Sequence, residues 1–466
     1  MTTTPPPRRP ARTTPPAAPP PLPAAAPRPG TAAEPPVVLR VSDPRELLAL
    51  VPHQLGFRPE RSLVLVCLRG ERRRVGLVVR ADLPRLEAAE RRDLADRRVG
   101  GDLVERVGGV VDRLVDLAVR DGAAAVVAVV YDDPAEPDLL SADQDPRVDG
   151  LPGLVELLLG GACASAGVRL MDAWWVDGLR YRSLGCRDAR CCPAEGAPLE
   201  ALHGSVVAAE MVSRGSSPAD SRDGLLDDLR PAPPEQRRDA ARSAATARRR
   251  ARRAAADQAR AARVRAEALA SFRAAAEVER LAAAAAPVGS EGPEAAERRG
   301  GDPGPAVAHG PGGELHDPAL LGRLGAALRD PWLRDAVLVS CLPGAGELPE
   351  QMVLTGPDVR AEELLDGVVG GVEGAQEPDA ELLGPVAAVL AAVVRHLPGA
   401  AGAEALAALA WSAWWCGDGA RAVVCAERAL EAREGTSMAE LVLDLVDAGA
   451  APAWVRARRA LETASG

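Results

Sequence analysis

Two apolar segments that follow each other closely constrain the fold more than any other feature of the chain. The first is a run of six apolar residues, 63–68, within GFRPERSLVLVCLRG, and the second lies in RRVGLVVRADLP, residues 73–84. Short apolar runs bounded by turn residues predict strands that are buried in a sheet. Because the arginine-rich break between them is short, the two strands are expected to form an antiparallel pair.

Helices and further strands are predicted around this pair. Ser42 is placed to cap a short helix that ends near Pro52, since a glutamate follows four residues later and a proline stands in the first turn. Apolar residues at helical spacing over 103–118 predict an amphipathic helix. The strand expected at 123–133 is reached through that helix, which predicts a parallel crossover.

The first half of the chain therefore has the pattern of an α/β domain. A second helix is expected over 154–166, and the dipeptide Asp177-Gly178 lies between two strand-like segments, which is a strong hairpin signal. Together these elements predict an α/β domain over residues 37–230, with about five strands in a mixed sheet and helices covering it.

Composition divides the rest of the chain into four segments. Residues 1–36 are rich in proline and alanine and are expected to be a disordered tail. Residues 231–286 contain mainly Ala, Arg and Glu without a large apolar stripe, which predicts a solvent-exposed helix. A flexible linker is expected over 287–313, and a helical domain over 314–466. Within that domain, residues 406–431 resemble one tetratricopeptide-type helix pair, whereas a free-standing array needs about three.

Charge and cysteine usage narrow the classes of protein. All 56 basic residues are arginine, because lysine is absent, and the formal net charge is −10. This charge gives no global attraction to nucleic acid. No apolar run approaches the roughly 18 residues of a membrane span, and the proline-rich start lacks the apolar core of a secretory signal. The expected location is therefore the cytoplasm, with reduced thiols and no membrane partner.

Four segments in a fixed order support a family resemblance. They are LLALVPHQLGFRPERSLVLVCLRG, RVGLVVRADLP, WWVDGLRYRSLGC with CRDARCCPAEGAPL, and the W-x-x-W-W-C-G-D-G-A helix pair near the C-terminus. The chain thus resembles the actinobacterial domain of unknown function 4192 family over most of residues 37–464. His53 departs from the pattern, where an aromatic or apolar residue is expected. The resemblance implies no activity.

One cysteine cluster has ligand types that suit a metal ion. Cys186, Cys191 and Cys192 form C-x4-C-C directly after a predicted hairpin strand, and His203 follows eleven residues later. Three thiolates and an imidazole would complete a tetrahedral zinc site. The alternative is a set of inert thiols in a turn, because two adjacent cysteines do not easily point at one ion. No other cofactor is predicted.

Three aspartates stand where predicted strands end. Asp132 and Asp133 follow the third strand, and Asp82 ends the second. Open α/β sheets bind ligands at this edge, where paired carboxylates hold Mg²⁺ or polarise a water molecule. The alternative is that each aspartate forms a polar turn. His53 is expected to be a partly buried, hydrogen-bonded residue, because no serine or cysteine beside it suggests a nucleophile pair.

The arginine-rich stretch 242–265 raises the question of nucleic acid. It holds nine arginines against one acid, Asp257. Nine phosphate contacts would give steep salt dependence. However, the arginines lie all around the predicted helix and no aromatic residues accompany them, which favours a solvated helix.

Three functional hypotheses remain open. The leading one is a non-enzymatic scaffold or interaction protein that binds another protein through the helical domain 314–466. The second is a small-molecule or metal-dependent enzyme with its site at the strand ends, and the third is a nucleic-acid accessory protein. Trp411, Trp414 and Trp415 lie at helical spacing. They are expected to be packing residues, unless an exposed one marks a partner groove.

Overall fold

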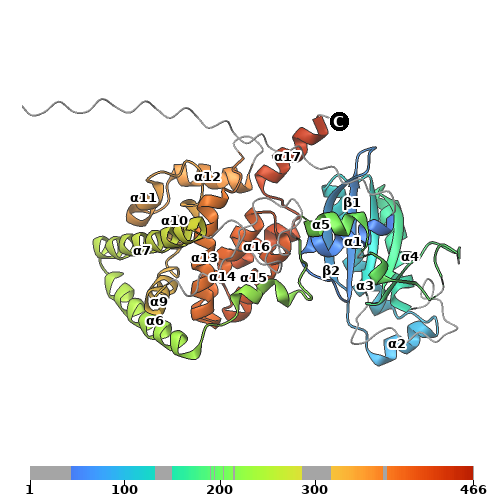
Figure 1. Cartoon of the computed structure of the whole chain (residues 1–466), viewed down its shortest axis with the longest axis horizontal. Helices are drawn as coiled ribbons and strands as arrows, with labels where there is room; N and C mark the ends of the chain where they lie inside the picture. Colours follow the sequence, from blue (N-terminus) through green and yellow to red (C-terminus); the bar gives the residue numbers. More distant parts are fainter. Residues whose placement is uncertain are drawn as a thin grey trace, which may run out of the picture. The chain divides into compact units, whose positions relative to one another are not determined.

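The structure is a computed structural model, and Figure 1 shows its elements in chain order. It describes residues 44–131, 150–188, 190–193, 195–202, 204–213, 216–285, 316–370 and 375–464. The predicted tail 1–36 and the predicted linker 287–313 lie outside these residues. The α/β fold of the first half and the helical fold of the second are both confirmed.

Six strands form one mixed sheet in the first half. They are β1 (Ser62–Arg69), β2 (Arg74–Asp82), β3 (Ala125–Tyr131), β4 (Arg169–Val176), β5 (Arg180–Ser183) and β6 (Ala197–Pro198). Their order is β2-β1-β3-β4-β5-β6, so β2 and the two-residue β6 form the edges. β3 and β4 run parallel, and every other neighbouring pair is antiparallel. The predicted antiparallel pair β1–β2 and the hairpin β4–β5 are thereby confirmed.

The connections follow the predicted crossover. β2 and β3 lie on either side of β1, and both run antiparallel to it, so they are parallel to each other. Helix α3 (Gly101–Arg120) joins them. It ends where expected, with Asp121 at the C-cap and Gly122 at a φ of +74°. This backbone conformation suits glycine, which has no Cβ.

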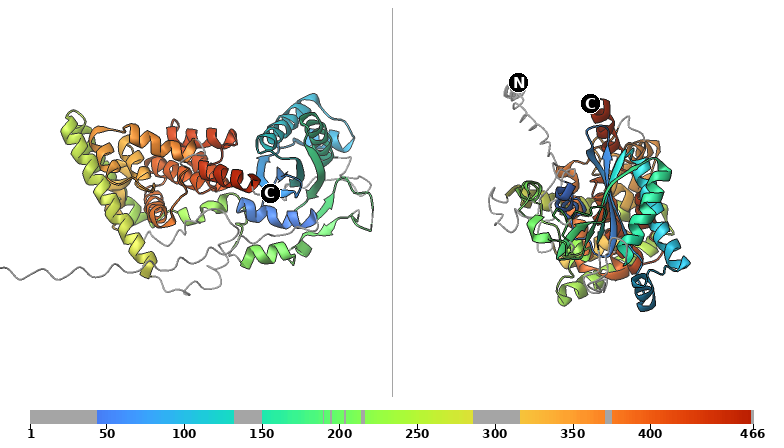
Figure 2. Two further views of the ribbon diagram at one scale, coloured as in Figure 1. Left: turned by 90° about the horizontal axis from the view of Figure 1, so that it is seen from above. Right: turned by 90° about the vertical axis from the view of Figure 1, so that its right-hand side faces the viewer.

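Helices cover both faces of the sheet (Figure 2). Leu63, Leu65 and Cys67 of β1 share one core cluster with α3 and α4 (Gly150–Ala166), because alternate residues of a strand point to the same face. The intervening residues, such as Val64, are also fully buried. Helices α1 (Pro44–Leu55) and α5 (Val206–Ser213) pack together on the face of the sheet opposite to α3 and α4. The smaller helix α2 (Ala88–Ala95) contacts α4.

The predicted end of the first helix is wrong. α1 continues past Pro52 to Leu55, and Gly56 with a φ of +75° follows it. A proline inside a helix removes one hydrogen bond but does not force the chain to stop when neighbouring contacts hold the turn. Val51 and Leu55 are both buried, so packing on the sheet keeps this last turn helical.

The second half is a compact helical assembly. Its elements are α6 (Pro234–Ala254), α7 (Gln258–Ala285), α9 (Pro318–Ala327), α10 (Pro331–Val339), α11 (Leu348–Thr355), α12 (Val359–Val369), α13 (Ala380–His396), α14 (Ala403–Trp415), α15 (Gly419–Ala432), α16 (Ser437–Asp447) and α17 (Ala453–Ala464). Trp411, Trp414 and Trp415 are all buried, which confirms their packing role. Among the described helices, none combines the length and the apolar character that crossing a bilayer requires.

The expectation that residues 231–286 form an exposed helix without a packing face is wrong. Ala240 and Ala244 of α6 are buried, and so are Leu269 and Phe272 of α7, in one core cluster with α9 and α13. A row of alanines offers little apolar area, but it lets two helix backbones approach closely. Gly322 of α9 lies directly against the backbone of Ala240. Packing of small residues, rather than a leucine stripe, therefore docks this hairpin.

Candidate functional site

Of the three aspartates predicted at strand ends, the structure describes one. Asp82 is the last residue of β2, and its half-exposed carboxylate accepts a 2.6 Å hydrogen bond from the Arg80 guanidinium. Ser62 pairs with Asp82 on one side and with Tyr131 on the other, so the ends of β2 and β3 lie about 10 Å apart, two strand spacings. Asp132 and Asp133 lie outside the described residues. Convergence of the three carboxylates thus stays a prediction.

The cysteine cluster begins at a hydrogen-bonded corner after β5. The N–H of Cys186 donates to Ser183 Oγ at 3.1 Å, and that hydroxyl donates to Asp172 Oδ1 at 2.8 Å. Asp172 stands on β4, so the corner is fixed to the sheet through two strands. Burial raises the pKa of the Asp172 carboxyl, and the hydrogen bonds from Ser183 and the Ala173 N–H oppose that rise.

The turn that follows brings the three sulfur atoms together. The backbone N–H groups of Cys191 and Cys192 both donate to the carbonyl of Asp188, at 3.1 and 2.7 Å. The Sγ atoms of Cys186, Cys191 and Cys192 all lie within 4.8 Å of one another, and those of the adjacent pair are 4.0 Å apart. The adjacent cysteines of this turn thus have their sulfur atoms close together, although adjacent cysteines were not expected to point easily at one ion. His203 lies outside the described residues.

The three thiols differ in their surroundings. Cys192 is buried, Cys191 is exposed and Cys186 is half-buried. Burial raises the pKa of Cys192 to about 11. A hydrogen bond from the Asp188 backbone, followed by one from the Cys192 thiol, lowers the pKa of Cys186. The three sulfur atoms therefore lie close together, and hydrogen bonds between the thiols link them.

An acidic pair beside this corner escaped the sequence analysis. Glu156 of α4 and Asp172 of β4 each have a carboxylate oxygen 3.9 Å from the position that a Cβ on Gly185 would take. Burial raises the pKa of Glu156, the Arg187 guanidinium opposes this, and the Asp172 charge adds to it. The two residues are 16 positions apart in sequence and belong to different elements, so no local spacing signals their proximity.

His53 is the half-buried, hydrogen-bonded residue that was expected. Its Nδ1 lies 2.6 Å from Ser216 Oγ, a serine 163 positions away that no local motif could reveal. Burial, followed by the Arg58 charge, lowers the pKa of His53. Ser216 is buried, and Ala219 nearby bridges to Phe57 in a parallel pairing. The histidine–serine pair therefore ties the end of α1 to the segment that follows α5.

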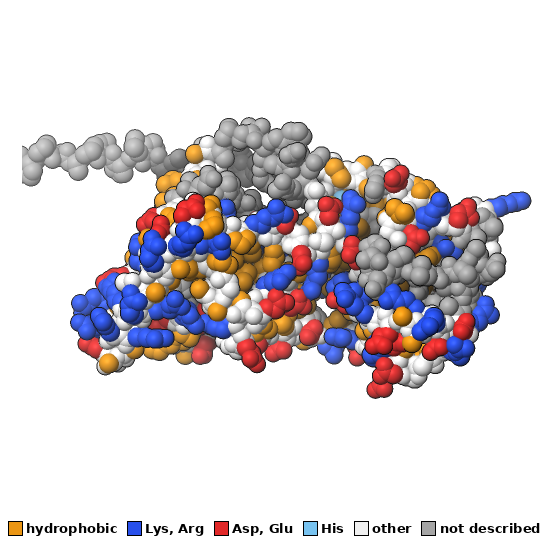
Figure 3. All heavy atoms as spheres, turned by 90° about the horizontal axis from the view of Figure 1, so that it is seen from below, with side chains coloured by type: hydrophobic (Ala, Val, Ile, Leu, Met, Phe, Trp, Pro, Cys, Tyr) orange, Lys and Arg blue, Asp and Glu red, His pale blue; other side chains and the backbone are white. Residues whose placement is uncertain are grey.

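The arginine-rich stretch is split between α6 and α7, and several of its guanidinium groups are engaged within the fold. Arg250 pairs with Glu267 on the partner helix of the hairpin. Arg265 donates to the carbonyl of Val353 at 2.8 Å and stacks over Trp332, with its guanidinium carbon 4.5 Å from the ring centroid. Basic side chains still gather at the left of Figure 3, where α6 and α7 lie. These contacts support a structural use of part of the stretch.

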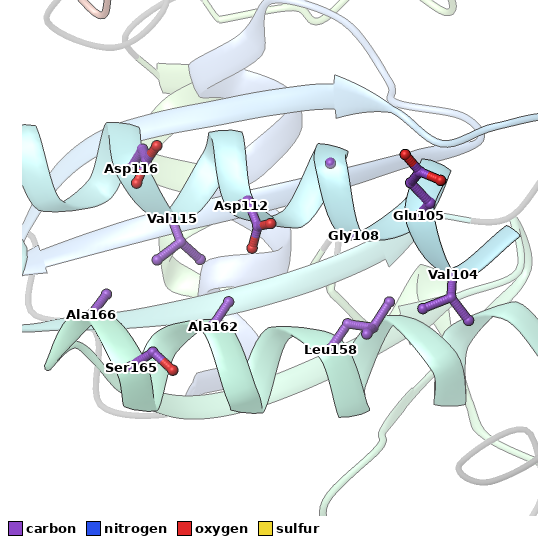
Figure 4. A pocket seen from close by; sticks show the side chains of 11 residues that line it. Val104, Glu105, Gly108, Asp112, Val115, Asp116, Leu158, Ala162, Ser165 and Ala166 are labelled. Carbon is purple, nitrogen blue, oxygen red and sulfur yellow. The ribbon is translucent and has the colours of Figure 1, made fainter. Parts of the chain in front are cut away.

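The sequence analysis did not foresee a groove between α3 and α4. It has a volume of about 770 Å³ and is open to solvent. Figure 4 shows Glu105, Asp112 and Asp116 along α3, with Leu158 and Ala162 on α4 on the other side of the groove; of the three acidic side chains, Asp112 points toward α4. Further lining residues are Val104, Gly108, Gly109, Val115, Ser165 and Ala166.

The charge of the groove is one-sided. Glu105, Asp112 and Asp116 are all exposed, and none of these three carboxylates is paired with a cation in the described part of the chain. The opposite wall is uncharged, and an added Cβ at Gly108 or Gly109 would meet no atom within 4 Å. Positions 105, 112 and 116 lie at helical spacing, so the sequence alone places the three acidic residues on one face of α3. Because acidic residues are common on the outer face of a helix, this pattern did not indicate a groove.

Comparison with known proteins identifies the family. The family model described as "Domain of unknown function (DUF4192)" matches residues 44–453. The chain belongs to the DUF4192 family. This confirms the resemblance drawn from the four segments, and it brings no activity with it. No curated protein and no solved structure matches the chain.

Proposed function

We propose that this DUF4192 chain is a non-enzymatic protein-interaction protein, and that the groove between α3 and α4 binds a basic segment of its partner. The observation that carries the proposal is the row of three unpaired carboxylates, Glu105, Asp112 and Asp116, along one wall of an open groove. Surfaces with complementary charge steer a partner and fix its register.

The dimensions of the groove suit a helix or an extended segment. Glu105 and Asp116 are about 16 Å apart along the axis of α3, at 1.5 Å per residue. A partner helix of similar length can place three cations against the row. Gly108 and Gly109, which have no side chain, and the small Ala162 let the partner's backbone approach closely, while the half-buried Leu158 offers apolar contact.

The same charge argues against nucleic acid at this surface, because three carboxylates repel phosphate groups. The helical domain, residues 314–466, is the region that the sequence predicts to bind another protein, and that stays a prediction. Its three clustered tryptophans, Trp411, Trp414 and Trp415, do not supply the contact there, since all are buried.

The test compares two charge-reversed proteins of full length. The groove variant carries Glu105→Arg, Asp112→Arg and Asp116→Arg. A matched control reverses one glutamate and two aspartates on α16, which are also exposed and on one helix face: Glu440→Arg, Asp444→Arg and Asp447→Arg. The probe is a synthetic helical peptide with three arginines on one face and leucine and alanine beside them. A scrambled peptide of the same composition measures non-specific attraction.

The wild type and the α16 variant are expected to bind the patterned peptide more tightly than the scrambled one. The groove variant should lose affinity by roughly threefold to 150-fold, since each exposed ion pair contributes about 0.2–1 kcal/mol. The affinity should also fall as salt is added. In extracts of the native host, partners should be retained by the wild type and the α16 variant but lost from the groove variant. Equal peptide affinity for both variants, or identical retained proteins, would overturn the proposal.

A further inference from the structure

We infer that Cys186, Cys191 and Cys192 bind one zinc ion through their three thiolates. This inference goes beyond the proposed function and does not depend on it, because the cysteine turn and the α3–α4 groove share no residue. It rests on the separation of the sulfur atoms, on the hydrogen bonds that hold the turn, and on the access of the site to solvent.

The sulfur positions fit one ion. A tetrahedral site with Zn–S bonds of about 2.3 Å has sulfur atoms about 3.8 Å apart. The Cys191 and Cys192 sulfur atoms are 4.0 Å apart, and all three lie within 4.8 Å of one another. Closing the remaining gap requires less than about 1 Å of side-chain movement. A disulfide, by contrast, needs a sulfur–sulfur distance of about 2 Å.

Hydrogen bonds outside the cluster hold the turn in this geometry. The chain Cys186 N–H to Ser183 Oγ to Asp172 Oδ1 fixes one end of the turn to β4 and β5, with donor–acceptor distances of 3.1 and 2.8 Å. The carbonyl of Asp188 accepts from both adjacent cysteines and fixes the other end. Outer hydrogen bonds of this kind orient the ligands of metal sites.

The donor set and its exposure favour zinc. Thiolates select Zn²⁺, Cu⁺ or iron–sulfur clusters over Mg²⁺ or Ca²⁺, and three sulfur atoms on one short turn suit a single four-coordinate ion. Cys191 is exposed, which provides a path for the ion, while Cys192 is buried. On binding, each thiol loses its proton to solvent and forms a Zn–S bond, so no electron transfer is involved. The fourth position is then taken by a ligand other than these three thiolates.

The experiment uses the full-length protein, purified under reducing conditions. Zinc is measured by elemental analysis after exposure to a weak chelator, and Co²⁺ is then titrated as a spectroscopic probe. We expect one ion per chain and a sulfur-to-cobalt charge-transfer absorption. Cys191→Ser is the informative variant, because its side chain is exposed and its folding should be unaffected. Its zinc affinity should fall at least about 100-fold, since losing only an outer partner costs about 10–100-fold.

The control is Cys163→Ala on α4, a buried cysteine outside the cluster, which should keep full zinc content. A second variant, Cys186→Ser, should also weaken the charge-transfer band, and circular dichroism reports whether it folds. Two results would refute the inference: no zinc or cobalt bound by the wild type, or zinc affinity unchanged in Cys191→Ser. If the metal-free protein lost two free thiols after the reductant was removed, the cluster would form a disulfide instead.

Discussion

The closest backbone approach in the helical part lies at Gly322, and Gly322→Ala should disrupt it. A Cβ added there would lie 2.8 Å from the carbonyl carbon of Ala240 and 2.9 Å from its Cα, and nearer still to its carbonyl oxygen. Ordinary contacts of a Cβ begin at 3.4 Å, so the carbonyl carbon alone requires α6 and α9 to separate by 0.6 Å, and the nearer carbonyl oxygen requires more. Because the opposing atoms are backbone, no side chain can rotate away.

Two opposing effects set the magnitude. Overpacking of a buried contact costs about 1–3 kcal/mol, and a backbone clash belongs at the upper end. Replacing glycine by alanine inside a helix stabilises the helix by about 1 kcal/mol, because alanine has the higher helix propensity. The net effect of Gly322→Ala should therefore be a loss of about 2 kcal/mol in the free energy of unfolding.

The assay combines urea unfolding with amide hydrogen exchange. Gly322→Ala should lower the urea midpoint and speed exchange along α6, because loosening the contact exposes that helix. The control is Gly161→Ala on α4, where an added Cβ meets nothing within 4 Å. It should raise stability by up to about 1 kcal/mol. If Gly322→Ala were as stabilising as the control, the docking of α6 on α9 would be wrong.

Two further predictions concern buried charge. Glu404 is buried and accepts hydrogen bonds from Arg334, at 2.9 Å, and from Arg433. Glu404→Ala should therefore lower the free energy of unfolding by about 3 kcal/mol or more, whereas Glu277→Ala, at an exposed ion pair, should lower it by less than about 1 kcal/mol. Equal urea midpoints for the two variants would contradict this. Burial lowers the pKa of His396 below its usual 6.5, so the folded state resists a proton that the unfolded state accepts. The stability that wild type holds over His396→Gln should be complete above about pH 6.5 and decline as the pH falls below the lowered pKa of His396. A stability difference independent of pH would disprove this cause.

Much of the fold was accessible from the sequence because its signals are local. Apolar runs, one amphipathic helix and the Asp177-Gly178 turn specify strands, a helix and a hairpin through contacts a few residues apart. The docking of α6 was not accessible, because Ala240 and Ala244 bury little area each and acquire a role only once Gly322 lies against them.

For the candidate sites too, sequence revealed the residue types but not the contacts that tertiary packing creates. The cysteines were recognised from residue type, but their sulfur distances depend on the turn at Asp188, which spacing alone did not reveal. The proximity of Ser216 to His53 and of Glu156 to Asp172 depends on tertiary packing of separate elements. Sequence therefore predicted which side chains could act, and structure was needed to show which of them meet.

The edges of the sheet have a consequence for the solubility of the chain. β2, at one edge, begins with the exposed Arg74, and β6, at the other, is only two residues long. A foreign strand that paired along β2 would meet the exposed charge of Arg74 at the start of that strand, and β6 is too short to serve as a template. A sheet rich in valine and leucine is thereby protected from growing into aggregates, whichever partner the molecule binds.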